Sequence, residues 1–245
     1  MVGAPAAADA VRRARSLPGL RVGLHVVVVD GDPVSERAQI PDLLDRDGRL
    51  RNGLAVYAAQ AAVLPATRRQ IASEIAAQFA AYEATGLALD HVNAHRHFHL
   101  HPAVAAAILK IGRRYGMRAL RIPLEPWRIV ADIEPQTQRQ AGRMIAPWSA
   151  LLRRRVRHAG FVTADAVFGL AWSGAMTQKR VAALLGRLPP GLVEIYFHPA
   201  TTNSFAGAAP GYRYADEFAA LCDAACIAAA RRSGYPRGGY ADAGA

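Results

Sequence analysis

The stretch LALDHVNAHRHFHLHPAVAAAILKIGRRYG, residues 87–116, indicates the fold class. It begins as an apolar, strand-like segment over 87–95, passes through a run of histidines, and continues as a helix that Pro102 opens and Gly116 ends. A strand followed directly by a helix is the repeating unit of parallel sheets. We therefore expect an α/β protein.

The same alternation of strands and helices continues on both sides of this stretch. Apolar, β-branched segments predict strands at 20–29, 117–123 and 191–199, and a short strand or loop at 162–170. Helical periodicity predicts helices at 6–17, 67–86, 177–188 and 214–232, with basic helical character around 150–158. This order predicts a parallel sheet with covering helices, either open or closed into a barrel.

The helix expected at 67–86 has the most complete set of sequence signals. Thr67 and Gln70 have the spacing of a capping box, and Gly86 follows the last periodic residue as a C-terminal cap. One face of the helix is apolar and consists of Ile71, Ile75, Phe79 and Tyr82. We expect that face to pack in the core.

Length and composition are those of a folded domain. The chain has 245 residues and a mass of 26.2 kDa, with 52% hydrophobic and 20% charged residues, which excludes a disordered or fibrous protein. No apolar stretch reaches the roughly 18 residues that cross a bilayer. Cys222 and Cys226 are too few for a disulfide scaffold, and we expect both as small core residues. We expect a single domain over 1–235 and a flexible tail over 236–245.

The net charge of +11 raises the question of a nucleic-acid partner. Of the 30 basic residues, 28 are arginine, and alanine is very common, which indicates a coding bias more than a selected DNA-binding surface. The sequence contains no recognisable helix-turn-helix, zinc-finger or RNA-binding motif. We therefore expect no nucleic-acid partner. The densest basic run, Arg153–Arg157, is either a solvated helix face or a contact with an anionic membrane or substrate.

Histidines at strand ends supply the most distinctive chemistry of the sequence. His25 lies on an otherwise apolar strand, and His198 follows the apolar segment EIYF. Five of the eight histidines lie within eleven residues, as His91, His95, His97, His99 and His101. Imidazole is the commonest neutral ligand of zinc and similar ions, so the pattern predicts a metal-dependent hydrolase of α/β type. The other reading is that His25 is a core residue and the cluster a fortuitous metal-binding loop.

Five segments together resemble one known family: GLHVVVVDGDPV, HVNAHRHFHLHP, RIPLEPW, FGLAWSGAM and EIYFHPA. They are similar, in order and over nearly the whole chain, to the YdjC-like carbohydrate deacetylases, and in particular to the branch associated with hopanoid biosynthesis (HpnK). The resemblance implies a distorted barrel of parallel strands with helices outside. It also implies removal of acetyl groups from N-acetylated amino sugars with a divalent metal ion, with Mg²⁺ and Zn²⁺ as the first candidates.

The resemblance assigns roles to individual residues. His25, in the GLH motif, and His95 match the two metal-binding histidines. His198 matches the late histidine that is expected to protonate the leaving amine. Substrate-binding residues are expected among Arg121, Trp172 and His97.

The chain departs from the family's pattern in two places. The second metal histidine usually follows Asp-Ser, and here it follows Asn93–Ala94. The family's first strand ends in Thr-Ala-Asp-Asp-Phe-Gly, whose aspartates supply a metal ligand and a general base, whereas Met1–Pro5 match what should come after that strand and its helix. Thr163–Gly169 look like the motif but contain one aspartate and match a later segment. We therefore expect a barrel without its first strand and helix, through a misplaced start or a true truncation.

The resemblance also bears on partners. It implies an N-acetyl amino-sugar conjugate as substrate and, in this branch, an N-acetylglucosaminyl hopanoid. A membrane-embedded substrate and the positive charge lead us to expect a cytoplasmic protein with peripheral contact to the inner membrane through anionic lipid. A homo-oligomer is compatible with the sequence. The alternative function is that of an inactive relative that binds sugar or lipid without hydrolysis.

Overall fold

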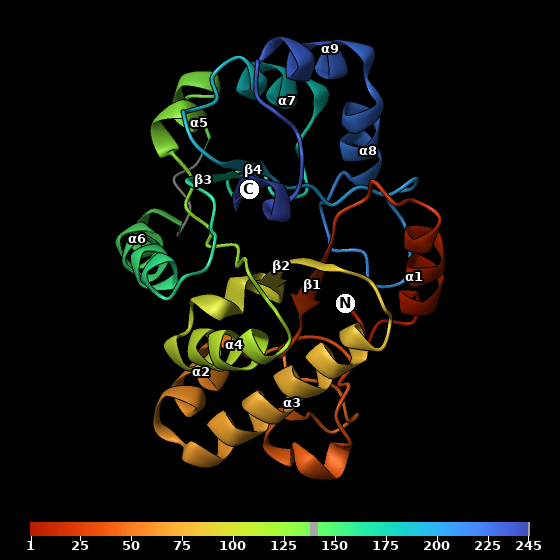
Figure 1. Ribbon diagram of the computed structural model, residues 1–245, viewed down its shortest axis with the longest axis vertical. Coiled ribbons are helices and arrows are strands. Elements are labelled where there is room, and N and C mark those ends of the chain that lie inside the picture. The colour runs from red at the N-terminus through yellow and green to blue at the C-terminus, as the bar shows by residue number, and fades with distance from the viewer. Residues whose placement is uncertain (138–141, 245) are drawn as a thin grey trace. The chain divides into compact units, whose positions relative to one another are not determined.

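Two compact units make up the computed structural model, which describes residues 1–137 and 142–244 (Figure 1). Unit 1 comprises residues 1–121, 154–163 and 238–245, and unit 2 comprises residues 122–153 and 164–237. Both units combine parallel strands with helices, so the predicted α/β class is confirmed.

Unit 1 is organised around the parallel pair of β1 (Val22–Val26) and β2 (Leu89–Ala94). Single parallel bridges extend this arrangement, from Val92 to Leu120 and from Ala119 to Val162. The strand predicted at 117–123 is therefore present only as isolated bridges. The helices of this unit are α1 (Ala7–Arg15), α2 (Leu54–Val63), α3 (Pro65–Glu83) and α4 (Pro102–Arg114).

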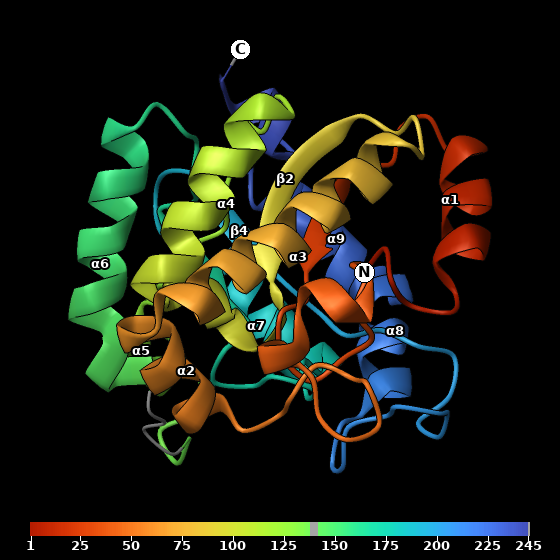
Figure 2. The same cartoon turned by 90° about the horizontal axis from the view of Figure 1, so that it is seen from below.

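Helices α3 and α4 lie side by side against the β1–β2 pair (Figures 1 and 2). The predicted apolar face of α3 is confirmed as core, with exposures of 5% or less for Ile71, Ile75, Phe79 and Tyr82. The predicted capping box is wrong. Pro65 takes the first helical position, so Thr67 lies inside the helix and no side chain caps it. The predicted glycine after the helix is confirmed, since Gly86 has a φ of +71°.

Side chains of α3 hold the chain just beyond β1. The side-chain amide of Gln78 accepts a hydrogen bond from the backbone N–H of Val27 and donates one to its carbonyl. The buried carboxylate of Glu74 accepts from the backbone N–H groups of Val34 and Ser35. These contacts satisfy backbone groups that a neighbouring strand would otherwise pair. They also position the loop that follows His25.

Unit 2 contains the parallel pair of β3 (Ala166–Phe168) and β4 (Val193–Ile195). Its helices are α5 (Trp127–Ile133), α7 (Gln178–Leu185), α8 (Tyr214–Cys222) and α9 (Ala224–Arg232), and α6 (Gly142–His158) begins in this unit. The prediction of a single helix over 214–232 is wrong, because α8 and α9 are separate helices. Asp223 is extended and its side chain accepts a hydrogen bond from the N–H of Cys226, which starts α9.

Several other expectations are modified by the structure. Within the described residues the strands form no closed sheet, so the expected barrel is not seen. Cys226 is buried as expected, but Cys222 is exposed. In the expected flexible tail, Tyr240 is buried and its backbone N–H donates to Asp90. No helix in residues 1–137 and 142–244 is both long and apolar enough to cross a membrane.

Candidate active site

His25 and His95 come together at the carboxyl ends of β1 and β2. His25 lies on β1 opposite Asn93 in the strand register, and His95 is the first residue after β2. Their ring centroids are 5.7 Å apart, with the ring planes at 72°. Parallel strands end at the same edge of a sheet, which is why two residues 70 positions apart in sequence meet here.

The imidazole of His25 is held in a largely desolvated position. Burial lowers the pKa of His25 to about 3, with smaller contributions from the nearby charges of His95 and Arg121. The ring is therefore neutral at pH 7, which is the form that binds metal ions.

Asn93 connects His25 to Arg121. Its side-chain amide lies 2.5 Å from Nδ1 of His25. With the amide nitrogen toward His25, the amide oxygen accepts from the Arg121 guanidinium at 3.1 and 3.2 Å. In the opposite orientation the amide oxygen accepts from Nδ1–H of His25, which leaves Nε2 with its lone pair. The orientation of Asn93 thus selects the His25 tautomer.

The other histidines of the run do not continue the strand, because β2 ends at Ala94. Arg96 and His97 have positive φ angles of 51° and 54°, which turns the chain sharply. His99 is fully buried, and burial lowers its pKa to about 3. His101 caps α4 by accepting a hydrogen bond from the N–H of Ala103. The four alternating histidines therefore do not share one face.

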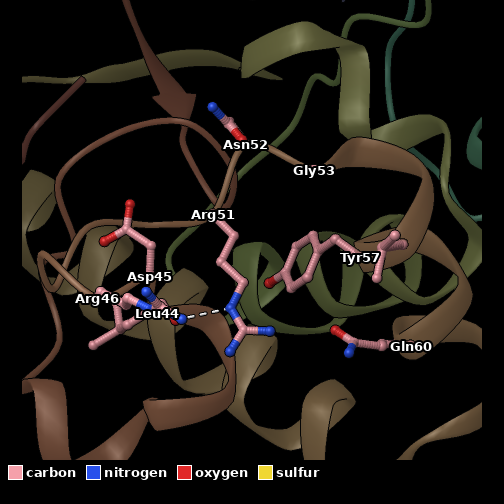
Figure 3. A pocket seen from close by; sticks show the side chains of 9 residues that line it. Leu44, Asp45, Arg46, Arg51, Asn52, Gly53, Tyr57 and Gln60 are labelled. Atoms are coloured by element: carbon pink, nitrogen blue, oxygen red, sulfur yellow. Dashed lines mark hydrogen bonds between the residues drawn. The ribbon is translucent and has the colours of Figure 1, made fainter.

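A pocket of about 490 Å³ in unit 1 is lined by α2 and by the loop before it (Figure 3). The Tyr57 ring stacks on Phe98 at 5.3 Å, and Figure 3 shows its hydroxyl pointing toward Arg51. Nε of Arg51 donates to the carbonyl of Leu44 at 2.8 Å, which anchors the guanidinium. The lining is rich in hydrogen-bond donors and comprises Leu44, Asp45, Arg46, Arg51, Asn52, Gly53, Val56, Tyr57 and Gln60. None of the residues predicted as site residues lines it.

His198 lies in unit 2, three residues beyond β4. Its ring packs edge-on against Tyr196 and Tyr212, with centroid distances of 5.5 and 5.1 Å. The fully buried Glu217 lies beneath it, and the His198 Nδ1 to Glu217 Oε2 distance is 4.0 Å. His198 is partly exposed, with 36% of its side chain accessible.

Trp172 is a core residue of unit 2. Its exposure is 2%, it belongs to the buried cluster around Phe168, and its indole N–H donates to Thr137. Arg180 covers its ring at 5.4 Å. Because the ring is enclosed by protein, we leave Trp172 out of the candidate site.

Glu125, in the RIPLEPW segment, organises the loop that precedes Trp172. Its carboxylate accepts hydrogen bonds from the backbone N–H groups of Gly169, Leu170 and Ala171 at 2.8–3.1 Å. Burial raises the pKa of Glu125, and these three bonds oppose that rise. The RIPLEPW and FGLAWSGAM segments are therefore joined through one side chain.

Replacing Glu125 by alanine is expected to destabilise the protein by about 3 kcal/mol. The change leaves three partly buried N–H groups without their acceptor, and each such loss costs roughly 1–3 kcal/mol when unsatisfied. Urea unfolding at pH 7 measures the effect. Asp216→Ala is the control, because it removes an exposed ion pair with Arg213 worth less than about 1 kcal/mol. Equal losses in the two variants would contradict this role for Glu125.

The described residues supply an incomplete metal site. Within residues 1–137 and 142–244, no group of three or more histidine, cysteine, aspartate or glutamate side chains is placed to hold a metal ion. Two imidazoles, those of His25 and His95, are of the ligand type that suits zinc.

The sequence matches the family described as "YdjC-like protein" over residues 1–232. This chain belongs to the YdjC-like family. Two curated relatives match almost its full length. A chitooligosaccharide deacetylase of Klebsiella pneumoniae is 30% identical over 99% of this chain and 85% of its own, and a carbohydrate deacetylase of Geobacillus stearothermophilus is 27% identical over 93% and 78%.

Other curated relatives of this YdjC-like protein match over a shorter region. A carbohydrate deacetylase of Brevibacillus brevis is 37% identical, but the match covers 48% of this chain and 43% of the relative. The matched part of this chain therefore spans less than half of the length of the Brevibacillus protein.

The fold of this YdjC-like protein is also similar to a crystal structure. That structure is of a proposed cellobiose-phosphate cleavage protein from Enterococcus faecalis, with a TM-score of 0.72 and 19% identity. The likeness covers 99% of this chain and 85% of the other, and it concerns the fold.

Three residues that hold segments of this YdjC-like protein in place were not predicted from the sequence. Asn93 was noted only as a departure from the family's pattern, and its contact with His25 depends on strand register. Glu125 accepts hydrogen bonds from backbone groups 44 to 46 residues away. Glu217 accepts from backbone groups 41 and 19 residues away. Only the position of Glu125 within RIPLEPW carried a sequence signal.

Proposed function

We propose that this YdjC-like protein is a metal-dependent hydrolase that removes the acetyl group from an N-acetylated amino sugar. The observation that carries the proposal is the approach of His25 and His95 at the ends of two paired parallel strands. The named activities of the Klebsiella and Geobacillus relatives support the reaction class.

His25 and His95 would hold the metal ion. Zn²⁺ or Mg²⁺ at this place would supply Lewis-acid activation of a water molecule and of the acetyl carbonyl. Each imidazole, when neutral, can offer the lone pair of one ring nitrogen to the metal ion. Asn93 orients the ring of His25. The positions not filled by protein would be taken by water or substrate.

On unit 2, we assign His198 the role of general acid. As imidazolium it would donate a proton to the leaving amine nitrogen. The carboxylate of Glu217 lies 4.0 Å from Nδ1 of that ring. On unit 1, Arg121 and His97 are kept as candidate substrate-binding residues, and the donor-rich pocket beside Tyr57 suits the hydroxyl oxygens of a sugar.

The Asn93→Asp variant is expected to bind zinc about 10-fold more tightly. A carboxylate only accepts hydrogen bonds, so it would hold Nδ1–H of His25 toward itself and leave Nε2 for the metal. Isothermal titration with Zn²⁺ measures the affinity. Asn203→Asp adds the same charge at an exposed position of unit 2 and should leave the affinity unchanged. Weaker zinc binding by Asn93→Asp would argue against His25 as a ligand through Nε2.

The activity is tested by acetate release. The purified chain is incubated with N,N′-diacetylchitobiose and each of Zn²⁺, Mg²⁺, Mn²⁺ and Co²⁺, and acetate is quantified. We expect release with at least one metal, and none after chelation. No release under any of these conditions, with a folded protein, would contradict the proposal for this substrate class.

A second candidate function is sugar or lipid binding without hydrolysis. The observation that favours it is the lack of a third protein ligand in the described residues. It predicts that diacetylchitobiose or a glycosylated hopanoid binds, measured by titration calorimetry, while no acetate appears with any metal.

The finer substrate, an N-acetylglucosaminyl hopanoid, and a cytoplasmic location at the inner membrane are part of the proposal. They are motivated by the resemblance of the motifs and by the net charge of +11. Part of the Arg153–Arg157 run is used within the protein, because Arg153 and Arg157 donate to the carbonyls of Asp165 and Thr163. Sedimentation with liposomes should increase with anionic lipid content if the membrane contact exists.

A further inference from the structure

Glu217 is a fully buried carboxylate in the first turn of α8. Glutamate is almost never fully buried unless hydrogen bonds or an ion pair compensate the loss of water. The contacts of its two oxygens therefore indicate what it does.

The two oxygens of Glu217 hold two segments that carry site motifs. Oε1 accepts a hydrogen bond from the backbone N–H of Met176, at the end of FGLAWSGAM, at 3.0 Å. Oε2 accepts a hydrogen bond from the backbone N–H of His198. The same Oε2 lies 4.0 Å from Nδ1 of the His198 ring. One carboxylate thus fixes the main chain of His198 and faces its imidazole.

The ring of His198 is also restrained from its sides. Tyr196 and Tyr212 pack edge-on against it. Tyr212 is itself held, because its hydroxyl lies 2.9 Å from the Ser173 hydroxyl and its ring rests on Gly174, where any β-carbon would collide with it. Gly174 has a φ of +74°, which a residue with a side chain rarely adopts. The imidazole therefore contacts two tyrosine rings, and the carboxylate lies 4.0 Å from its Nδ1.

We propose that Glu217 is a positioning residue for His198. It holds the ring with Nδ1–H toward the carboxylate and stabilises the imidazolium, so that Nε2 is the nitrogen that gives the proton to the leaving amine. This inference rests on the role proposed above for His198. A carboxylate within 4–6 Å favours the charged imidazole, and the group that faces one ring nitrogen determines which nitrogen is used for proton transfer.

The Glu217→Gln variant of the full chain tests the proposal. Glutamine keeps the size of the side chain but removes its charge. We expect the pKa of His198, measured by NMR from its ring protons, to fall by about one unit or more. In the acetate assay kcat should fall at least about 10-fold while KM stays within about twofold. Glu217→Asp keeps the charge and should retain most of the His198 pKa.

Glu125→Gln is the matched control. It neutralises another carboxylate of unit 2 that accepts backbone N–H groups, but its bonds go to Gly169, Leu170 and Ala171. We expect no change in the pKa of His198 in this variant. Circular dichroism identifies variants that fail to fold, and Glu217→Asp then supplies the comparison with wild type.

Two results would overturn the inference. One is a His198 pKa in Glu217→Gln that equals the wild-type value. The other is an equal shift in Glu125→Gln, which would mean a general loosening of unit 2. Failure of the proposed function is a separate outcome. If the wild-type chain releases no acetate, the NMR measurements still decide whether Glu217 controls His198.

Discussion

The His95→Ala variant is expected to lose metal binding and deacetylation together. His95 supplies one of the two imidazoles that meet at the ends of β1 and β2. A change in a residue that only orients a ligand costs 10–100-fold in metal affinity, so loss of a ligand should cost at least about 100-fold. If the metal contributes several kcal/mol to the transition state, kcat/KM should fall about 1,000-fold. Metal content after dialysis and acetate release measure the two effects.

His158→Ala is the control for this prediction. His158 is an exposed histidine at the end of α6, so its removal tests whether metal is bound adventitiously by surface imidazoles. We expect its metal content and activity to equal those of the wild type. If His95→Ala retains stoichiometric metal and activity, the pair of His25 and His95 is not the metal site.

The His198→Ala variant is expected to keep its metal and lose turnover. General acid catalysis by a positioned side chain contributes typically 10²–10⁴-fold, so kcat should fall by about that factor. His198 is not one of the proposed metal ligands, so we expect the substitution to leave metal binding unchanged. Steady-state kinetics and metal analysis on the same preparation separate the two properties.

Chemical rescue sharpens this second prediction. Added imidazole can enter the space left by the removed ring and replace the proton donor, so it should restore part of the rate in His198→Ala. It should have little effect on the wild type. Full activity of His198→Ala without imidazole would remove His198 from the mechanism.

The α/β class followed from the sequence because the apolar periods of its strands and helices are long and well separated. The face of α3 from Ile71 to Tyr82 was predicted correctly, since helical spacing alone places those side chains together. The start of α3 was predicted wrongly. The helix begins at Pro65 and not after Thr67, because the fixed φ of proline suits the first helical position. The break at Asp223 was missed because a single capping carboxylate interrupts an otherwise helical period.

The residues of the candidate site also divide into those that the sequence could indicate and those that depend on tertiary packing. His25, His95 and His198 were predicted as site residues from residue type and from their places at strand ends. Trp172 was placed in the substrate pocket by its motif, yet it is buried in the core of unit 2. Its burial depends on residues such as Met176 and Val181 that pack around it from other elements.

By itself the sequence determined the class of fold and the family and singled out the candidate histidines, because these depend on local periodicity and on residue type. Only the tertiary structure decided which histidines meet and which groups orient them. Strand register brings Asn93 to His25, and the end of β2 at Ala94 places His97, His99 and His101 beyond the strand. Helix α8 carries Glu217 beneath His198. Such contacts join residues distant in sequence, and no local pattern encodes them.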